Sequence, residues 1–93
     1  MGIEEFASSV RCKIVIERPP SATFWLCHIE GIAGVDEALG FTSYFGTGNT
    51  PEEAIAGYLV FLRGCKRIAI RAEGRVNYYR ARQMAVPADL SRN

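Results

Sequence analysis

The sequence predicts an α+β fold in which one antiparallel sheet packs on a single main helix. Three observations indicate this fold: a capped amphipathic helix over residues 50–63, two segments rich in β-branched and aromatic residues at 12–17 and 23–29, and an alternating segment at 67–71. The order is β-β-β-α-β, with a fifth strand left open. At 93 residues the chain is expected to form a single domain (1–93), with the N-terminal segment 1–10 and the C-terminal tail 87–93 less ordered.

The helix carries clear signals at both ends. Thr50 stands at the N-cap position, Pro51 at the first helical position and Glu53 three residues after the cap, which together form a capping box. Gly64 follows the helical segment, where a left-handed C-terminal residue is common. One apolar stripe at helical spacing runs between these ends and is formed by Ile55, Tyr58, Leu59 and Leu62. The helix is therefore expected to pack on the sheet through this stripe.

The two upstream strands each divide into a core face and an outer face, because side chains alternate along a strand. The expected core face is formed by Cys12, Ile14, Ile16, Trp25, Cys27 and Ile29. The outer face carries Val15 beside Phe24, Leu26 and His28, and is too apolar for contact with water alone. Another segment or a partner is expected to cover it.

The stretch between the second strand and the helix is rich in glycine. Residues 31–40 are predicted as a loop with at most one helical turn, residues 41–45 as the third strand, and residues 46–49 as the connection into the helix.

The segment after the helix predicts a strand and a turn. Ile68 and Ile70 alternate with basic residues, so the isoleucines are expected to point inward and the basic side chains outward. Glu73 and Gly74 mark the turn. Residues 75–85 are compatible with a strand or a helix, and a hairpin strand is favoured.

The charges are separated along the chain. The 11 Lys and Arg side chains nearly balance the 10 Asp and Glu side chains over the whole sequence. Residues 1–60 carry three basic and eight acidic residues, whereas residues 61–93 carry eight basic and two acidic residues. Such asymmetry suits binding to an acidic partner or to a nucleic acid, or attraction between the two halves of the chain itself.

Neither a membrane span nor an export signal is indicated. The sequence has no run of about 18 apolar residues, and its first ten residues lack the basic and apolar blocks of a signal peptide. Three cysteines without a Cys-x-x-Cys pair are typical of a reduced, intracellular protein. A cytoplasmic location is therefore expected, with no membrane partner.

The residue types that catalysis and metal binding require are sparse. His28 is the only histidine, and its neighbour Cys27 is expected on the opposite face of the same strand, so the two cannot act as a dyad. A single histidine without a Cys-x-x-Cys pair provides no zinc site. The stretch 46–49 precedes the helix as phosphate-binding loops do, but Glu52 and Glu53 would repel an anion there. No catalytic residue, metal or cofactor is predicted, and the protein is expected not to be an enzyme.

The candidate binding residues come from two places. The segment 75–83 interleaves arginine with tyrosine, a composition that suits single-stranded nucleic acid, because arginine contacts phosphates and tyrosine stacks on bases. The same residue types are enriched at protein–protein hot spots, and a tyrosine here can also fill the core, so all three interpretations stay open. The predicted partner-binding residues are Val15, Phe24 and Leu26 of the outer face, with Arg75, Tyr78, Tyr79, Arg80 and Arg82 of this segment.

The stretch FGTGNTPEEAIAGYLVFL, within residues 41–62, resembles the HicB-type antitoxin family and related small proteins of phages and mobile elements. The strands KIVIE and FWLCHIEG precede it, in the family's order of strands, glycine-rich turn, helix and strand. The resemblance implies a non-catalytic inhibitor that docks on a small toxin ribonuclease. The sequence departs from the family at residues 31–34, where the family's Pro-Asp-x-Pro-Gly turn is absent, and no DNA-binding module is expected after residue 72.

These observations predict a small non-enzymatic interaction module. It is expected to act as an inhibitor or accessory protein that occludes a partner protein such as a nuclease or toxin, in the manner of an antitoxin or of a phage anti-defence or anti-CRISPR protein. Self-association into a homodimer through the apolar outer face is also expected. The alternative is a nucleic-acid-binding accessory protein that uses the basic C-terminal segment.

Overall fold

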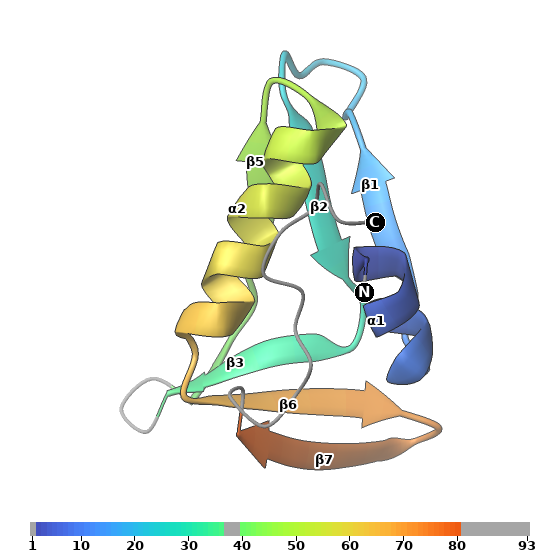
Figure 1. Ribbon diagram of the computed structural model, residues 1–93, viewed down its shortest axis with the longest axis vertical. Helices are drawn as coiled ribbons and strands as arrows, with labels where there is room; N and C mark the ends of the chain where they lie inside the picture. Colours follow the sequence, from blue (N-terminus) through green and yellow to red (C-terminus); the bar gives the residue numbers. More distant parts are fainter. Residues whose placement is uncertain (1, 37–39, 81–93) are drawn as a thin grey trace.

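The computed structural model describes residues 2–36 and 40–80, and over these residues the chain forms two helices and seven strands (Figure 1). The elements are α1 (Ile3–Ser9), β1 (Ile14–Glu17), β2 (Trp25–Ile29), β3 (Ile32–Asp36), β4 (Gly40–Thr42), β5 (Gly46–Gly48), α2 (Pro51–Gly64), β6 (Arg67–Ala72) and β7 (Arg75–Arg80). The α+β fold class predicted from the sequence is confirmed.

The described strands form two antiparallel sheets. The three-stranded sheet has the order β1-β2-β5, and the four-stranded sheet has the order β4-β3-β6-β7. Helix α2 lies along one face of the three-stranded sheet, and the strands of the four-stranded sheet run across the lower end of both (Figure 1). The chain passes from one sheet to the other at Gly31, where φ is +90° and the carbonyl accepts a hydrogen bond from the Arg71 N–H at 2.7 Å. This bond ties the corner to β6.

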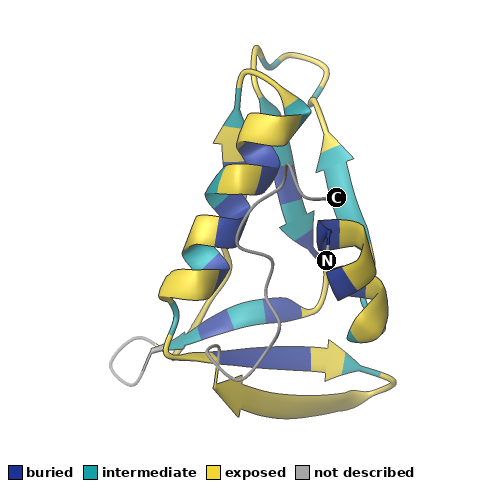
Figure 2. Cartoon of the chain, in the orientation of Figure 1, coloured by how far each residue is buried: buried dark blue, intermediate teal, exposed yellow. Residues whose placement is uncertain are grey.

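The core lies between α2 and the inner faces of the two sheets (Figure 2). Both helices and both sheets contribute to one cluster, formed by Ile3, Phe6, Ala7, Cys27, Ile29, Ile32, Ala54, Ile55, Tyr58, Leu59, Leu62, Ile68 and Ile70. The partly buried residues Cys12, Ile14, Ile16 and Trp25 pack against this cluster. The core face predicted for the first two strands is therefore confirmed.

Helix α2 begins as the sequence predicts. The Thr50 hydroxyl accepts a hydrogen bond from the backbone N–H of Glu53 at 3.1 Å, and Pro51 is the first helical residue. The predicted apolar stripe is buried. The C-terminal end differs from the prediction, because Gly64 is the last residue of the helix and Cys65 ends it in an extended conformation.

The hairpin after α2 is confirmed. Glu73 and Gly74 form a two-residue turn in which both φ angles are positive, +54° and +77°, the signature of a type I′ turn. Ala72 pairs with Arg75 across the turn, and Ile68 and Ile70 point into the core. Residues 75–80 are a strand, and the continuation to residue 85 lies outside the described residues.

The structure corrects the expected single sheet on a single helix. Residues 32–36, predicted as a loop, form β3, which pairs with both β4 and β6 and so organises a second sheet. The segment was predicted as a loop because Gly34 is at its centre, and glycine is uncommon inside strands. A Cβ at Gly34 would lie 3.0 Å from the Cys65 sulfur and 3.2 Å from the Phe61 ring. The glycine therefore makes room for the end of α2 against the strand.

The third strand predicted at residues 41–45 is replaced by two short strands. β4 ends at Thr42 and belongs to the four-stranded sheet, whereas β5 begins at Gly46 and pairs with β2 in the three-stranded sheet. Gly46 and Gly48 face α2, and a Cβ at Gly48 would lie 2.9 Å from the backbone nitrogen of Ala54. Gly46 and Gly48, which the sequence analysis assigned to the connection into the helix, are therefore needed for β5 to pack closely on α2.

Helix α1 was not predicted, because residues 1–10 were expected to be less ordered. Ile3, Phe6 and Ala7 are spaced as one face of a helix and are at most 2% exposed. The tail 87–93 lies outside the described residues. No helix in the described ranges is long and apolar enough to cross a membrane.

Candidate interaction surface

Strand β7 distributes the predicted binding residues over its two faces. Tyr78 is opposite Ala69 of β6, whereas Tyr79 is opposite Ile68, whose side chain is in the core. Since side chains alternate along a strand, Tyr78 and Arg80 lie on the outer face of the four-stranded sheet, and Arg75 and Tyr79 lie on its inner face. The structure therefore separates residues that the sequence grouped together, and Arg82 lies outside the described residues.

The outer face of the four-stranded sheet collects side chains from all four strands. Ala33 of β3 is opposite Ala69 of β6, and Val35 is opposite both Arg67 of β6 and Phe41 of β4. Strand alternation then defines the members of this outer face as Ala33, Val35, Phe41, Arg67, Ala69, Arg71, Val76, Tyr78 and Arg80. Aromatic and aliphatic groups thus lie among three arginines.

A hollow of about 390 Å³ opens on this outer face. Its lining residues are Gly31, Ile32, Ala33, Phe41, Ser43, Ala69, Arg71 and Val76. The small side chains of Ala33 and Ala69 lie in the two central strands, whereas Phe41 and Val76 project from the strands on either side. The hollow is therefore mostly apolar, with one guanidinium group at its border.

Tyr78 is the central aromatic residue of this face. Its ring is 6.2 Å from the Phe41 ring, centroid to centroid, with 22° between the ring planes. The Arg67 guanidinium carbon lies 5.3 Å from the centre of the Tyr78 ring, which is a cation–π contact. Both rings still meet solvent, since Phe41 is 61% and Tyr78 49% exposed. The contacts orient the two rings and leave part of each free.

Arg67 and Arg80 are direct cross-strand partners on this face. Like charges at opposite positions of an antiparallel pair destabilise the pairing. Both arginines and Arg71 are exposed. Across the described residues the one ion pair joins Arg11 to Glu73, so no described carboxylate balances the three arginines. The outer face therefore holds a charge repulsion that a bound anionic group would relieve.

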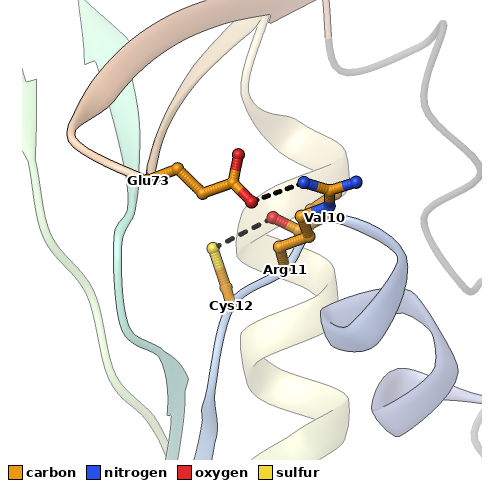
Figure 3. A network of polar contacts seen from close by, with 4 residues as sticks. All are labelled: Val10, Arg11, Cys12 and Glu73. Atoms are coloured by element: carbon orange, nitrogen blue, oxygen red, sulfur yellow. Dashed lines mark hydrogen bonds and ion pairs between the residues drawn. The ribbon is translucent and has the colours of Figure 1, made fainter.

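The inner face of β7 borders a different hollow. Arg75, Asn77 and Tyr79 line a space of about 520 Å³ that is closed on the other side by residues of α1 and its C-terminal end. Arg11, just beyond α1, forms an ion pair with Glu73 of the hairpin turn, and the Cys12 thiol donates to the Val10 carbonyl at 3.5 Å (Figure 3). Only the ion pair reaches the hairpin, because the contact between Cys12 and Val10 lies within the N-terminal segment. Tyr79 and Arg75 therefore belong to a separate site between α1 and β7.

The other predicted residues lie on the outer face of the three-stranded sheet. Val15 is opposite His28, which lies two residues from Leu26 on β2. Val15 and Leu26 therefore share the face that points away from the core, and both are half-buried. Phe24 immediately precedes β2 and is 40% exposed. The Phe45 ring meets His28 edge-on at 4.7 Å and covers part of this face. The predicted residues that the structure describes therefore lie on three surfaces: the outer face of the three-stranded sheet, and the outer and inner faces of the four-stranded sheet.

Sequence reasoning missed Phe41, Arg67 and Arg71 as members of the arginine-rich face. A signal for the two arginines was present, because the predicted turn at residues 73–74 fixes the pairing of the two strands beside it. That pairing puts Arg67 and Arg71 on the side opposite to the isoleucines, together with Tyr78. Phe41 could not be placed in this way, because it depends on β3.

The described side chains offer little to nucleophilic or metal chemistry. No group of three or more His, Cys, Asp and Glu residues in the described ranges is arranged to hold a metal ion. Burial raises the pKa of the Cys12 and Cys65 thiols and raises the pKa of Cys27 to about 12. The reactive thiolate form is therefore disfavoured at all three cysteines.

Comparisons of the chain with protein-family models, with curated proteins and with solved structures find no match.

Proposed function

We propose that this chain is a non-enzymatic interaction module that docks on a partner protein through the outer face of its four-stranded sheet. The observation that supports this proposal is the Arg67–Arg80 pair, which has no carboxylate partner among the described residues and lies beside an apolar hollow and two partly exposed aromatic rings. Tyrosine and arginine beside a pocket are the residue types that dominate binding energy at protein interfaces. The cost of opposing two arginines is repaid when a partner brings carboxylates to them.

The outer face of the four-stranded sheet supports a partner with apolar and acidic side chains side by side. An aliphatic or aromatic side chain of the partner would fill the hollow over Ala33 and Ala69, and acidic side chains beside it would meet Arg67, Arg71 and Arg80. The module would act by occlusion, as an inhibitor or accessory subunit. The resemblance to HicB-type antitoxins favours a nuclease or toxin as the partner, and the three free cysteines agree with a cytoplasmic site of action.

Affinity capture of the full chain from its native host, with and without nuclease digestion, tests this proposal. We expect a stoichiometric protein that survives digestion, and we expect Tyr78→Ala and Arg80→Ala to lose it. Tyr79→Ala and Arg75→Ala are matched controls, because they remove the same side chains from the opposite face of the same strand. Equal loss with the controls, or retention with the Tyr78 and Arg80 variants, would refute docking through the outer face.

A second candidate function is binding of single-stranded nucleic acid by the same face. Exposed Phe41 and Tyr78 on a sheet with three arginines are the groups that stack on bases and contact phosphates. This function predicts that an oligonucleotide binds with an affinity that falls steeply with salt, and that Tyr78→Ala weakens it while Tyr79→Ala does not. Proteins captured in the first experiment would then be lost on nuclease digestion.

A further inference from the structure

We propose that two copies of this chain pair through the edge of β1 that faces away from β2, in one antiparallel register that places Lys13 of each copy opposite Glu17 of the other. The dimer joins the two three-stranded sheets into one continuous sheet. This proposal concerns the edge of a different sheet from the docking face proposed above and does not depend on it.

Within residues 2–36 and 40–80, the edge of β1 offers unpaired backbone groups. β1 is bonded to β2 on one side, and no described strand pairs with its other side. The Lys13 carbonyl accepts a hydrogen bond from the Glu30 N–H at 2.8 Å, so the peptide groups of Lys13, and by alternation those of Val15 and Glu17, are directed toward β2. The peptide groups of Ile14 and Ile16 consequently point away from the sheet and are available to a second strand.

Charge selects the register among the pairings that these groups allow. With the twofold axis at Val15, Ile14 exchanges hydrogen bonds with Ile16 of the second copy, and the two Val15 side chains face each other. The residues at either end of this contact are Lys13 and Glu17, so each lysine meets a glutamate. Both side chains are exposed and lie on the same face as Val15. The edge is thus complementary to itself in charge.

The neighbouring registers are less favourable. Shifting the axis to Ile14 requires the Cys12 N–H to bond with Ile16 of the second copy, but this N–H already donates to the Ala7 carbonyl at 3.0 Å. Shifting the axis to Ile16 places Glu17 opposite Val15 of the second copy, so neither Lys13 side chain meets a glutamate. Only the axis at Val15 satisfies both the backbone groups and the charges.

The other sheet edges fit a second copy less well. β4 and β5 are three residues long. The longer edge strand β7 carries Arg75 and Arg80 and no acidic residue, so the same strand of a second copy would offer no opposite charge. Natural edge strands use charge to prevent pairing, and β7 follows this rule, whereas β1 carries opposite charges at matching positions.

Charge reversal tests the register, because reversing Lys13 or Glu17 alone breaks the proposed pair, whereas reversing both restores it. Sedimentation of the full chain over a range of concentrations should show a dimer for the wild type. Lys13→Glu and Glu17→Lys should each weaken dimerisation roughly tenfold or more, since each creates like-charge pairs. Mixing the two variants should restore a heterodimer, and the double variant should dimerise by itself. Circular dichroism confirms that each variant is folded, and Lys66→Glu is a control reversal at an exposed site away from β1.

A wild-type chain that stays monomeric at all concentrations would overturn the proposal. A dimer that tolerates both single reversals would do the same, as would single variants that are not rescued by mixing. A dimer that resists the reversals and is lost in Phe24→Asp would instead place the contact on the apolar face of the three-stranded sheet. In each case the test of the docking face stands independently, because Tyr78 and Arg80 lie on the other sheet.

Discussion

Gly46 of β5 lies so close to Tyr58 of α2 that a Cβ on the glycine would stand 2.8 Å from the Tyr58 Cβ. A Cβ at Gly57, on the same turn of the helix, would be 3.7 Å from the Cα of Gly46. The helix therefore approaches the strand through glycines, without a layer of side chains between them. This close approach accompanies the nearly complete burial of Tyr58, which is 1% exposed.

Gly46→Ala should destabilise the fold. The added methyl group would overlap the Ala54 carbonyl oxygen and the Tyr58 backbone, and neither can move without shifting α2. Overpacking of this kind costs about 1–3 kcal/mol. Urea denaturation measures the change in the free energy of unfolding.

Gly64→Ala is the matched control for this substitution. A Cβ at Gly64 meets nothing within 4 Å, and the residue lies in the last turn of α2. Its stability should equal or slightly exceed that of the wild type, because alanine favours the helix. Equal stability of the Gly46 and Gly64 variants would contradict the close approach of strand and helix.

Thr50→Ala should lower the free energy of unfolding by about 1 kcal/mol, the usual value of a helix N-cap. The hydroxyl at this position satisfies the backbone N–H of Glu53 at 3.1 Å. Thr50→Ser keeps the oxygen and should retain most of the stability. If serine and alanine destabilise the protein equally, the hydrogen bond of the cap does not explain the loss.

Elements whose signals are local could be predicted from the sequence, and elements defined by distant contacts could not. The cap of α2 and the alternation of β6 depend on near neighbours in the chain. β3 depends on its pairing with β6, far along the chain, and its central Gly34 fits because Phe61 packs over it. The same limit applies to the candidate surface: the hairpin places Arg67 beside Tyr78, but only β3 connects Phe41 to them.

The stability of the fold should fall as the pH rises above about 9–10. Burial raises the pKa of Tyr58 from 10 to about 12, and that of Cys27 from 9 to about 12. The folded state favours the neutral form of both groups. Their contribution to stability is therefore complete below the unfolded pKa values and is lost as the pH approaches 12. Each unit of pKa shift corresponds to about a tenfold change in the unfolding constant.

Tyr58→Phe distinguishes the contribution of the Tyr58 hydroxyl from that of the Cys27 thiol at high pH. Phenylalanine cannot ionise, so the variant should lose stability less steeply than the wild type between pH 10 and 12. Stability at each pH is measured by urea denaturation. Identical slopes for the two proteins would show that Tyr58 ionises in the folded state as it does in the unfolded chain.

Glu73→Asn should stabilise the β6–β7 hairpin. Glu73 has a φ of +54° in the turn, and a left-handed conformation costs a residue such as glutamate up to about 1–2 kcal/mol, whereas asparagine tolerates it. The substitution also removes the ion pair with Arg11, but both side chains are mostly exposed, so that pair contributes little. Glu73→Gln removes the ion pair but leaves an unfavourable residue in the left-handed conformation at position 73. The melting temperature of this variant should stay near that of the wild type. A higher melting temperature for asparagine alone would assign the gain to the turn, whereas equal losses in both variants would show that the contact between Arg11 and Glu73 outweighs the backbone.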